Sequence, residues 1–257
     1  MSLGALDLDA DLERRFGGLR RLHGQADYDR LRALRVAVVG VGGVGSWAAE
    51  ALARSGVATL VLIDLDQVAE SNINRQIQAL GATVGQAKVQ ALAQRIADIH
   101  PGCRVLQVEE FVEPANWPAL LPEPVDVLID ACDQVKAKAA LAAWGRAAGV
   151  PVVCCGAAGG KRQPQRLEVD DLSAVTHDPL LASLRNRLRR EHGAPRQGRI
   201  GLRCVFSRES VAPPADGAAC DSDGSLNCHG YGSSVMVTAA MGMTAAAEAV
   251  ACALARR

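Results

Sequence analysis

The sequence predicts an α/β fold of the Rossmann-like type, with a mostly parallel sheet, helices on both faces and an elaborated C-terminal part. Three observations predict it. Short apolar runs alternate with helical patterns, a glycine-rich turn follows the first apolar run, and acidic residues end two of the later runs. Near-continuous apolar strands are expected where helices cover both faces of a parallel sheet.

The first elements predict a strand, a tight turn, a helix and a second strand. A helical lead-in precedes them, broken at Gly17 and Gly18. The lead-in is expected at residues 11–34 and the first strand at 35–39. The glycine-rich turn follows at 40–46, the helix at 47–55 and the second strand at 58–64. This order is a βαβ unit, which requires a parallel sheet.

The same alternation continues to about residue 160. Further helices are predicted at 88–99 and 135–148, and further strands at 104–108, 125–130 and 150–154. Beyond residue 160 the rhythm weakens, and 209–234 is rich in Gly, Ser, Asp and Pro, which predicts a loop. The 257 residues suit one large domain. We expect a lead-in at 1–34, a nucleotide-binding core at 35–160 and a substrate-facing, dimer-forming part at 161–257.

The composition excludes several classes of function. Lys plus Arg and Asp plus Glu both number 28, so a wholly basic nucleic-acid binder is excluded, although a local basic patch is not. Aromatic residues make up 3%, which argues against broad stacking on single-stranded bases. None of the eight cysteines forms a C-x-x-C pair, so no zinc site of the usual spacing is predicted. Reduced thiols and the lack of a signal peptide predict a cytoplasmic protein.

The segment 235–255 is about as long as a membrane span. It is rich in Ala and Gly rather than Leu, and it contains Glu248 and two threonines. Since Ala contributes little transfer energy, we interpret the segment as a buried core or dimer-interface helix rather than a membrane helix.

The glycine turn predicts a nucleotide site. Gly40, Gly42 and Gly45 follow a strand and precede a helix. Glycine lets backbone N–H groups approach a phosphate, and the helix N-terminus adds partial positive charge. Asp64 ends the next strand, where an acid can accept hydrogen bonds from ribose hydroxyls. This pattern alone suits NAD as well as ATP, and a turn needed only for packing is the simplest alternative.

Two cationic residues favour ATP. Arg75 and Lys88 follow the second strand, and Lys88 opens a predicted helix. Displacement of pyrophosphate requires its negative charge to be neutralised, whereas hydride transfer does not. Each residue alone would more simply be a solvated surface charge. Asp130 and Asp133 stand at the end of a later strand, where a carboxylate can bind Mg²⁺ together with phosphates. The alternative role for either acid is to cap the helix that begins at Val135.

The motifs G-x-G-G-V-G-S, D-x-D-x-V-x-x-S-N-x-N-R-Q, G-x-A-K and D-x-x-D resemble the ubiquitin-activating-enzyme-like superfamily, the group of ThiF, MoeB and HesA. The resemblance implies that a carboxylate attacks the α-phosphate of ATP, giving an acyl-adenylate. By position, the implied phosphate-lining residues are Gly40, Gly42, Gly43 and Gly45. Asp64 would bind the ribose, Asn72, Arg75 and Lys88 the triphosphate, and Asp133 the Mg²⁺ and the reacting centre. Asp66, Asn74 and Gln76 belong to the same motif with less defined roles.

Further segments resemble one branch of this superfamily, the tRNA threonylcarbamoyladenosine dehydratases, over nearly the whole chain. They are R-F-G-G-L-x-R-L-H-G at 15–24, G-A-A-G-G at 156–160, C-V-F-S at 204–207 and C-x-G-Y-G at 228–232. The resemblance implies ATP-dependent cyclisation of the threonylcarbamoyl group on a tRNA adenosine, and a homodimer. It leaves open a monovalent cation at the late glycine-rich loop and a sulfur-relay protein partner.

Alternative functions remain open at this point. The chain could activate a ubiquitin-like sulfur carrier, use a nicotinamide cofactor, or bind ATP without turnover. One of Cys154, Cys155, Cys204, Cys220 and Cys228 could be a nucleophile, although buried thiols are the simpler interpretation. The segment 161–208 contains eleven basic and five acidic residues. Its arginines, from Arg185 to Arg208, either follow tRNA phosphates or form an ordinary solvated helix face.

Overall fold

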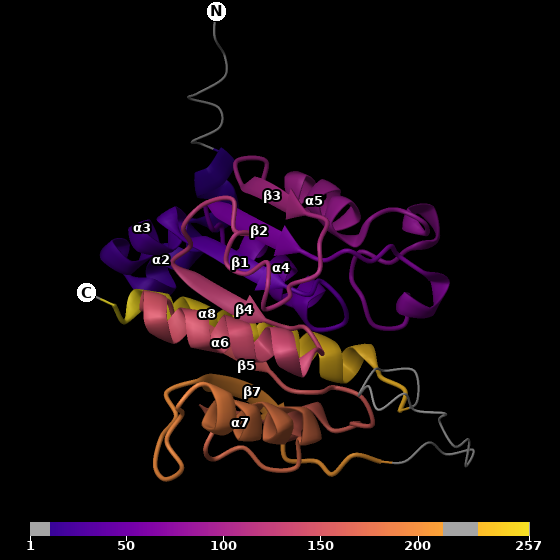
Figure 1. Ribbon diagram of the computed structural model, residues 1–257. Coiled ribbons are helices and arrows are strands. Elements are labelled where there is room, and N and C mark those ends of the chain that lie inside the picture. Colours follow the sequence, from indigo (N-terminus) through magenta and orange to yellow (C-terminus); the bar gives the residue numbers. More distant parts are fainter. Residues whose placement is uncertain (1–10, 213–230, 257) are drawn as a thin grey trace, which may run out of the picture.

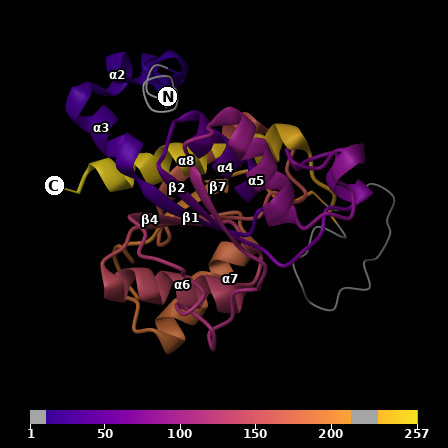
Figure 2. The same ribbon diagram turned by 90° about the horizontal axis from the view of Figure 1, so that it is seen from above.

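The computed structural model describes residues 11–212 and 231–256, which fold into a seven-stranded sheet between two layers of helices (Figures 1 and 2). The strands are β1 Arg35–Val39, β2 Thr59–Ile63, β3 Arg104–Val108, β4 Val127–Asp130, β5 Val152–Cys155, β6 Leu167–Asp171 and β7 Arg203–Ser207. Their order is β3-β2-β1-β4-β5-β7-β6, and β6 alone runs antiparallel to its neighbour. The predicted fold class is confirmed.

Helices cover the two faces in separate groups. The α-helices are α2 Gly18–His23, α3 Gln25–Ala33, α4 Gly45–Arg54, α5 Lys88–Ile99, α6 Val135–Ala148, α7 Pro179–Glu191 and α8 Val235–Leu254. Short 3₁₀ turns lie at η1 Glu70–Asn72, η2 Gly81–Thr83 and η3 Pro164–Arg166. Figure 2 shows α4, α5 and α8 on one side of the sheet and α6 and α7 on the other.

Alternation along each strand divides the interior into two cores. Val36 and Val38 of β1 pack with α4, α5 and α8, whereas Ala37 and Val39 pack on the side of α6 and α7. All four side chains are buried, as expected for a central strand covered on both faces. The segment predicted as a core helix, α8, packs against α4, and a Cβ on Gly242 would lie 2.4 Å from the Val44 carbonyl oxygen. Within the described ranges α8 is the one helix long and apolar enough to span a membrane.

The predicted elements up to residue 155 are all present, with shifted ends. Helix α4 begins at Gly45 rather than Trp47. Gly18 lies inside α2, and the second break in the lead-in falls at Gly24, which has φ 79°. Two strands were not predicted. Strand β6 contains three acidic residues on an edge of the sheet, so it shows no apolar run, and the short β7 lies in a basic stretch. Most of the predicted loop 209–234 lies outside the described residues.

The strand order places the site. Strand β1 lies between β2, to which the chain continues, and β4, which begins the other half of the sheet. The carboxyl ends of β1 and β4 therefore border a crevice, which is where ligands bind in open α/β sheets.

Candidate nucleotide-binding site

A cleft of about 430 Å³ opens at the carboxyl ends of β1, β2 and β4. Ten of the residues predicted from the sequence line it, namely Gly40, Gly42, Gly43, Asp64, Asp66, Asn72, Arg75, Gln76, Lys88 and Asp133. Two predicted residues, Gly45 and Asn74, do not line it. The structure thus gathers residues separated by more than ninety positions of sequence into one cavity.

The glycine turn brings backbone amides to the cleft. Gly40 has φ 80°, and a Cβ there would lie 3.0 Å from main-chain atoms of Ala131. Helix α4 starts immediately afterwards, and no side chain caps its first turn. Uncapped N–H groups at a helix N-terminus attract anions. The turn can therefore hold phosphate.

Gly45 does not line the cleft, and its lack of a side chain serves packing. A Cβ at this position would lie 1.8 Å from the carbonyl oxygen of Gly40. That distance is impossible for real atoms, so only glycine lets α4 start directly against the turn.

Asp64 joins the end of β2 to the glycine turn. Its side chain is 7% exposed. The carboxylate accepts the Val41 N–H at 2.8 Å through Oδ2 and the Asp66 N–H at 2.9 Å through Oδ1. Burial raises the pKa of Asp64, while the Lys88 charge and these two N–H groups oppose the shift. The charge at the floor of the cleft is thus held in a fixed position.

Lys88 is buried and already paired. Its Nζ lies 2.6 Å from Asp66 Oδ2, and its backbone N–H donates to the Asp66 carbonyl at 2.9 Å. The Lys88 side chain is 8% exposed, whereas that of Asp66 is 52% exposed. The ammonium is therefore held at the cleft wall by a carboxylate that faces solvent, and a phosphate can share it.

Arg75 is fixed through both its main chain and its side chain. Its carbonyl accepts the Trp47 Nε1–H at 2.9 Å and the Thr238 hydroxyl at 3.2 Å. One guanidinium nitrogen donates to the Ser71 carbonyl and to Asn74 Oδ1. Asn74, which does not line the cleft, therefore orients Arg75 from outside it.

Asn72 and Gln76 are buried in the wall of the cleft. Asn72 Oδ1 accepts the Ala69 N–H at 3.1 Å, which closes the turn η1. Gln76 Oε1 accepts a hydrogen bond from Gln78 at 3.2 Å. In each amide the oxygen is used internally, so the NH₂ group is the end left for an acceptor such as phosphate.

Asp133 is exposed at the mouth of the cleft, on the loop between β4 and α6. The N-cap of α6 is Gln134, without a capping side-chain bond. Neither Asp130 nor Asp133 caps this helix, so that alternative is wrong. The described residues contain no group of three His, Cys, Asp or Glu side chains that could hold a metal by themselves.

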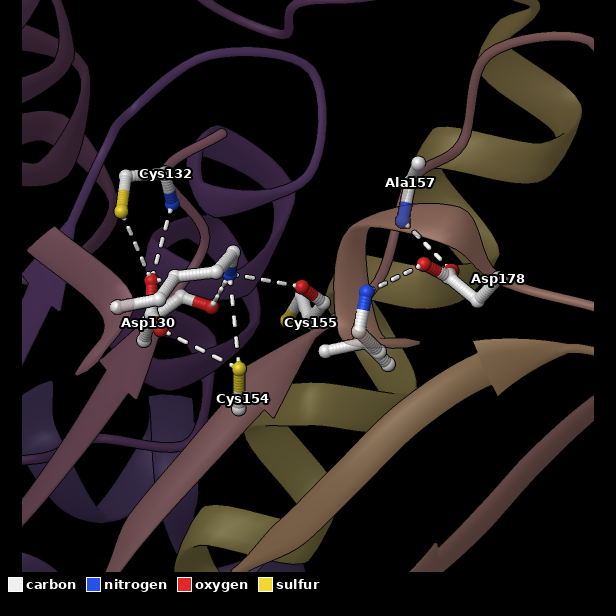
Figure 3. A network of polar contacts seen from close by, with 8 residues as sticks. Asp130, Cys132, Cys154, Cys155, Ala157 and Asp178 are labelled. Atoms are coloured by element: carbon white, nitrogen blue, oxygen red, sulfur yellow. Dashed lines mark hydrogen bonds and ion pairs between the residues drawn. The ribbon is translucent and has the colours of Figure 1, made fainter. Parts of the chain in front are cut away.

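Below this loop lies a buried ion pair that sequence reasoning did not identify (Figure 3). Lys138 and Asp130 are both 0% exposed, with Nζ 3.1 Å from Oδ1. Lys138 also donates to the Cys155 carbonyl at 2.8 Å. The thiols of Cys132 and Cys154 approach the Asp130 carboxylate at 3.0 and 3.2 Å. Burial alone would lower the pKa of Lys138, but the Asp130 charge raises it well above its ordinary value.

This network connects three segments at the edge of the cleft. Asp130 ends β4, Cys155 ends β5, and Lys138 lies in the first turns of α6. The loop that contains Asp133 is thereby fixed between β4 and α6. The available sequence signal was a lysine on the apolar face of an Ala-rich helix, where a buried charge needs a partner.

Asp178 anchors the segment 156–160 on the other side. It caps α7 by accepting the Leu181 N–H at 2.9 Å, and it accepts the Ala157 N–H at the same distance (Figure 3). A Cβ on Gly156 would lie 2.1 Å from its carboxylate. Residues 156–159 line the cleft. Other lining residues that the sequence analysis missed are Ser71, Glu110, Phe111, Gln134 and Thr238.

The described cysteines near the cleft are poor nucleophiles. Burial raises the pKa of Cys132 and Cys154 well above the ordinary value, and raises that of Cys155 to about 12. A nucleophilic cysteine needs a thiolate, which these environments disfavour. Cys220 and Cys228 lie outside the described residues.

Much of the basic segment is used within the fold. Arg185 donates to the carbonyls of Leu172 and Val175, and Arg189 donates to the carbonyl of Pro195. Ion pairs hold Arg187, Arg190, Arg203 and Arg208. Lys161 is buried among main-chain carbonyls. The helical alternative is therefore right for the arginines up to Arg190, which lie in α7.

Comparisons with known proteins identify the family of this chain. A sequence model of the ThiF family matches residues 14–256. The tRNA threonylcarbamoyladenosine dehydratase of Escherichia coli (strain K12) is 42% identical over 247 residues, 92% of each protein. Crystal structures of the E. coli tRNA N6-threonylcarbamoyladenosine dehydratase in complex with ATP and with AMP have TM-scores of 0.86 and 0.85, at 41% and 42% identity. Each match covers 95% of both chains. The chain belongs to the ThiF family.

Proposed function

We propose that the chain catalyses the ATP-dependent dehydration, by ring closure, of threonylcarbamoyladenosine beside the tRNA anticodon, in the cytoplasm. The observation that carries this proposal is the 42% identity to the E. coli dehydratase over 92% of both proteins. The cleft supports it, because backbone amides and two cationic side chains meet there at the carboxyl ends of the central strands.

The proposed nucleotide pose follows from the lining. The triphosphate would lie along Gly40, Gly42 and Gly43, with Arg75 and Lys88 beside it. Asp64 would accept hydrogen bonds from the ribose through the lone pairs that its backbone contacts leave free. Asn72 and Gln76 would donate their side-chain NH₂ groups to phosphate oxygens. Charge-assisted contacts of this kind are the strong ones.

Asp133 fits a role toward Mg²⁺. This ion commonly takes one or two carboxylates together with phosphates and waters, and Asp133 is an exposed carboxylate at the cleft. When bound, the ion would neutralise charge on the pyrophosphate. Asp66 is another acid of the lining, but it is paired with Lys88.

The reaction balances in two steps. The threonyl carboxylate attacks the α-phosphorus of ATP, and pyrophosphate leaves. The neighbouring urea-like nitrogen then attacks the activated carbonyl carbon, loses its proton, and expels AMP. Both partners belong to one nucleoside, so holding them in place supplies a high effective concentration. No enzyme nucleophile is required, which agrees with the raised pKa values of the described cysteines near the cleft.

The test is direct. Incubation with ATP, Mg²⁺ and threonylcarbamoylated tRNA should give a nucleoside lighter by one water, detected by mass spectrometry, with AMP and pyrophosphate formed in equal amounts. Unmodified tRNA is the control. If ATP were consumed instead with a carrier protein that ends in Gly-Gly, and not with the modified tRNA, the sulfur-carrier alternative would replace this proposal.

We also propose that the active form is a homodimer. Helix α8 exposes apolar side chains, with Met236 66%, Met243 41% and Val235 37% exposed. Contiguous exposed apolar groups mark interaction surfaces. Sedimentation velocity should give twice the chain mass of 26.9 kDa, and a monomer at micromolar concentration would contradict the proposal.

A further inference from the structure

A second cavity of about 430 Å³ opens on the side of α6 and α7. Its walls are the last two turns of α6, the start of β5, the end of α7 and the loop that leads into β7. Since β4, β5 and β7 are parallel, this is the edge where the strands begin, whereas the nucleotide cleft lies where they end. We call this cavity the α6–α7 groove. It shares no lining residue with the nucleotide cleft.

The groove has an apolar floor and a cationic rim. Its buried apolar side chains are Val152, Leu188, Ile200 and Leu202. The exposed side chains of Arg146, His192 and Arg199 supply its positive and titratable groups, and the lining contains no acidic residue. Such a surface fits a ligand with a flat, weakly polar part and negative charge at its edge, which describes a nucleotide unit.

The two arginines of the rim, Arg146 and Arg199, are available to bind a ligand. Neither Arg146 nor Arg199 has an ion pair or side-chain hydrogen bond with any other residue in the described ranges. This contrasts with the neighbouring Arg185 and Arg189, which are bound to main-chain carbonyls, and with Arg190, which is paired with Glu191. Guanidinium groups without an internal partner remain able to bind phosphate in bidentate fashion.

Positively charged residues also predominate in the sequence on either side of the groove. Apart from the buried Lys138, residues 135–148 and 179–202 contain eight cationic residues and a single acid, Glu191. The eight are Lys136, Arg146, Arg185, Arg187, Arg189, Arg190, Arg196 and Arg199. A small anionic ligand would not need so broad a field, whereas an RNA backbone would.

Helix α6 connects the groove to the cleft. Gln134 and Ala137 at its beginning line the nucleotide cleft. Ala142, Ala143, Gly145 and Arg146 near its end line the groove. A 14-residue helix is about 20 Å long, which is the span of a few nucleotides. One RNA can therefore reach both places.

We propose that the α6–α7 groove is a second contact site for the tRNA, outside the modified adenosine. Arg146 and Arg199 neutralise backbone phosphates, and the apolar floor takes a base or ribose of the same segment. This inference rests on the proposed function, since it assumes that tRNA is the substrate. RNA-binding proteins commonly combine phosphate contacts with pockets for unstacked bases.

The test compares two matched double variants. Arg146→Ala/Arg199→Ala removes the rim charges, and Arg54→Ala/Arg104→Ala removes two exposed arginines (58% and 56%) away from the groove. The dissociation constant for a full-length tRNA transcript is measured by fluorescence anisotropy over a range of salt concentrations. The groove variant should bind at least about tenfold more weakly, and its log–log salt slope should fall by about one to two. The control should stay within about twofold of the wild type.

A third variant tests the contribution of the apolar floor to tRNA binding separately from that of the rim charges. Ala143→Phe fills the groove and leaves the charge unchanged, so it should weaken binding without altering the salt slope. Melting temperatures and ATP binding verify that each variant is folded. Equal affinity and slope in the groove and control variants would overturn the inference. So would a groove variant that keeps tRNA binding but loses binding to phosphatidylglycerol vesicles.

The two proposals fail in different ways. If wild-type protein dehydrates the modified tRNA, and the groove variant does so with an unchanged KM, the function stands and the groove inference is wrong. If wild-type protein binds no tRNA and removes no water, the proposed function itself is wrong.

Discussion

Lys88 and Arg75 are held differently before any nucleotide binds. The Lys88 ammonium is buried against Asp66, so its charge is already compensated. The Arg75 guanidinium contacts a carbonyl and an amide oxygen, and its charge is uncompensated by any acid among the described residues. Phosphate binding at Lys88 must therefore compete with Asp66, whereas at Arg75 it gains a new ionic contact. Both contacts are expected to strengthen as negative charge develops on the leaving pyrophosphate.

Replacing either cation should slow turnover by roughly one to two orders of magnitude. A charge-assisted contact is worth about 1.5–3 kcal/mol, so Arg75→Ala or Lys88→Ala should lower kcat/KM for ATP by roughly ten- to 150-fold. Lys88→Ala should be the worse variant, because it leaves Asp66 facing the phosphates unpaired. The measurement is AMP release with modified tRNA, with Arg54→Ala as the surface control. Normal turnover in both variants would remove the phosphate assignment.

Removing one charge of the Asp130–Lys138 pair should destabilise the fold far more than removing both. Lys138→Met leaves a fully buried carboxylate without its counter-ion, and breaking such a pair costs about 3–5 kcal/mol. The double variant Asp130→Asn/Lys138→Met removes both charges and should recover most of that loss. Urea unfolding of the three proteins measures it. A single variant as stable as the wild type would show that the ion pair contributes nothing.

At the scale of elements, the site lies where the end of β2, the glycine turn and the start of α4 contact one another. Gly45 lets α4 begin against the carbonyl of Gly40, and Asp64 binds the same turn from β2. The positions of the strand ends, of the glycine turn and of Lys88 at a helix start were predictable from the sequence, because each follows a local pattern of residue types. The carboxylate–lysine pair and the Asp178 clamp were not, since each joins residues that only the folded sheet brings together.

The lead-in helices dock through a buried histidine that should make stability depend on pH. His100 is 1% exposed and packs against Phe16 in a tilted arrangement, with 4.7 Å between the ring centroids and 60° between the ring planes. Its Nδ1 has no partner among the described residues. Burial, with the nearby Arg32 charge, lowers its pKa from 6.5 to about 4.

The sign of that dependence follows from the lowered pKa. Between about pH 6.5 and pH 4 the unfolded chain binds a proton at His100 that the folded chain does not. Stability is therefore fully present above pH 6.5 and falls as the pH drops, by at most about 3 kcal/mol. Unfolding by urea at several pH values should show this loss, and His100→Gln should flatten it. An equal loss in that variant would assign the effect to other groups.

At the scale of the whole molecule, the nucleotide cleft and the proposed RNA groove occupy opposite edges of one sheet. The cleft draws residues from β1, β2, the loop after β3, the loop after β4 and α8. A ligand there contacts both helical layers and the middle of the sheet. Binding should therefore stabilise the folded chain as a unit rather than one segment of it.

This coupling gives a prediction for ATP binding. With ligand at 100 times its dissociation constant, the folded state gains about 2.7 kcal/mol. For a chain of this size, that should raise Tm by roughly 5–10 °C. Differential scanning fluorimetry with MgATP measures the shift. AMP at an equal multiple of its own dissociation constant should give the same shift, because the gain depends only on that ratio. At a fixed concentration, however, Arg75→Ala should reduce the shift with ATP and leave that with AMP nearly unchanged, if the arginine contacts the part of the triphosphate that leaves as pyrophosphate. An equal reduction with both nucleotides would place Arg75 away from the pyrophosphate.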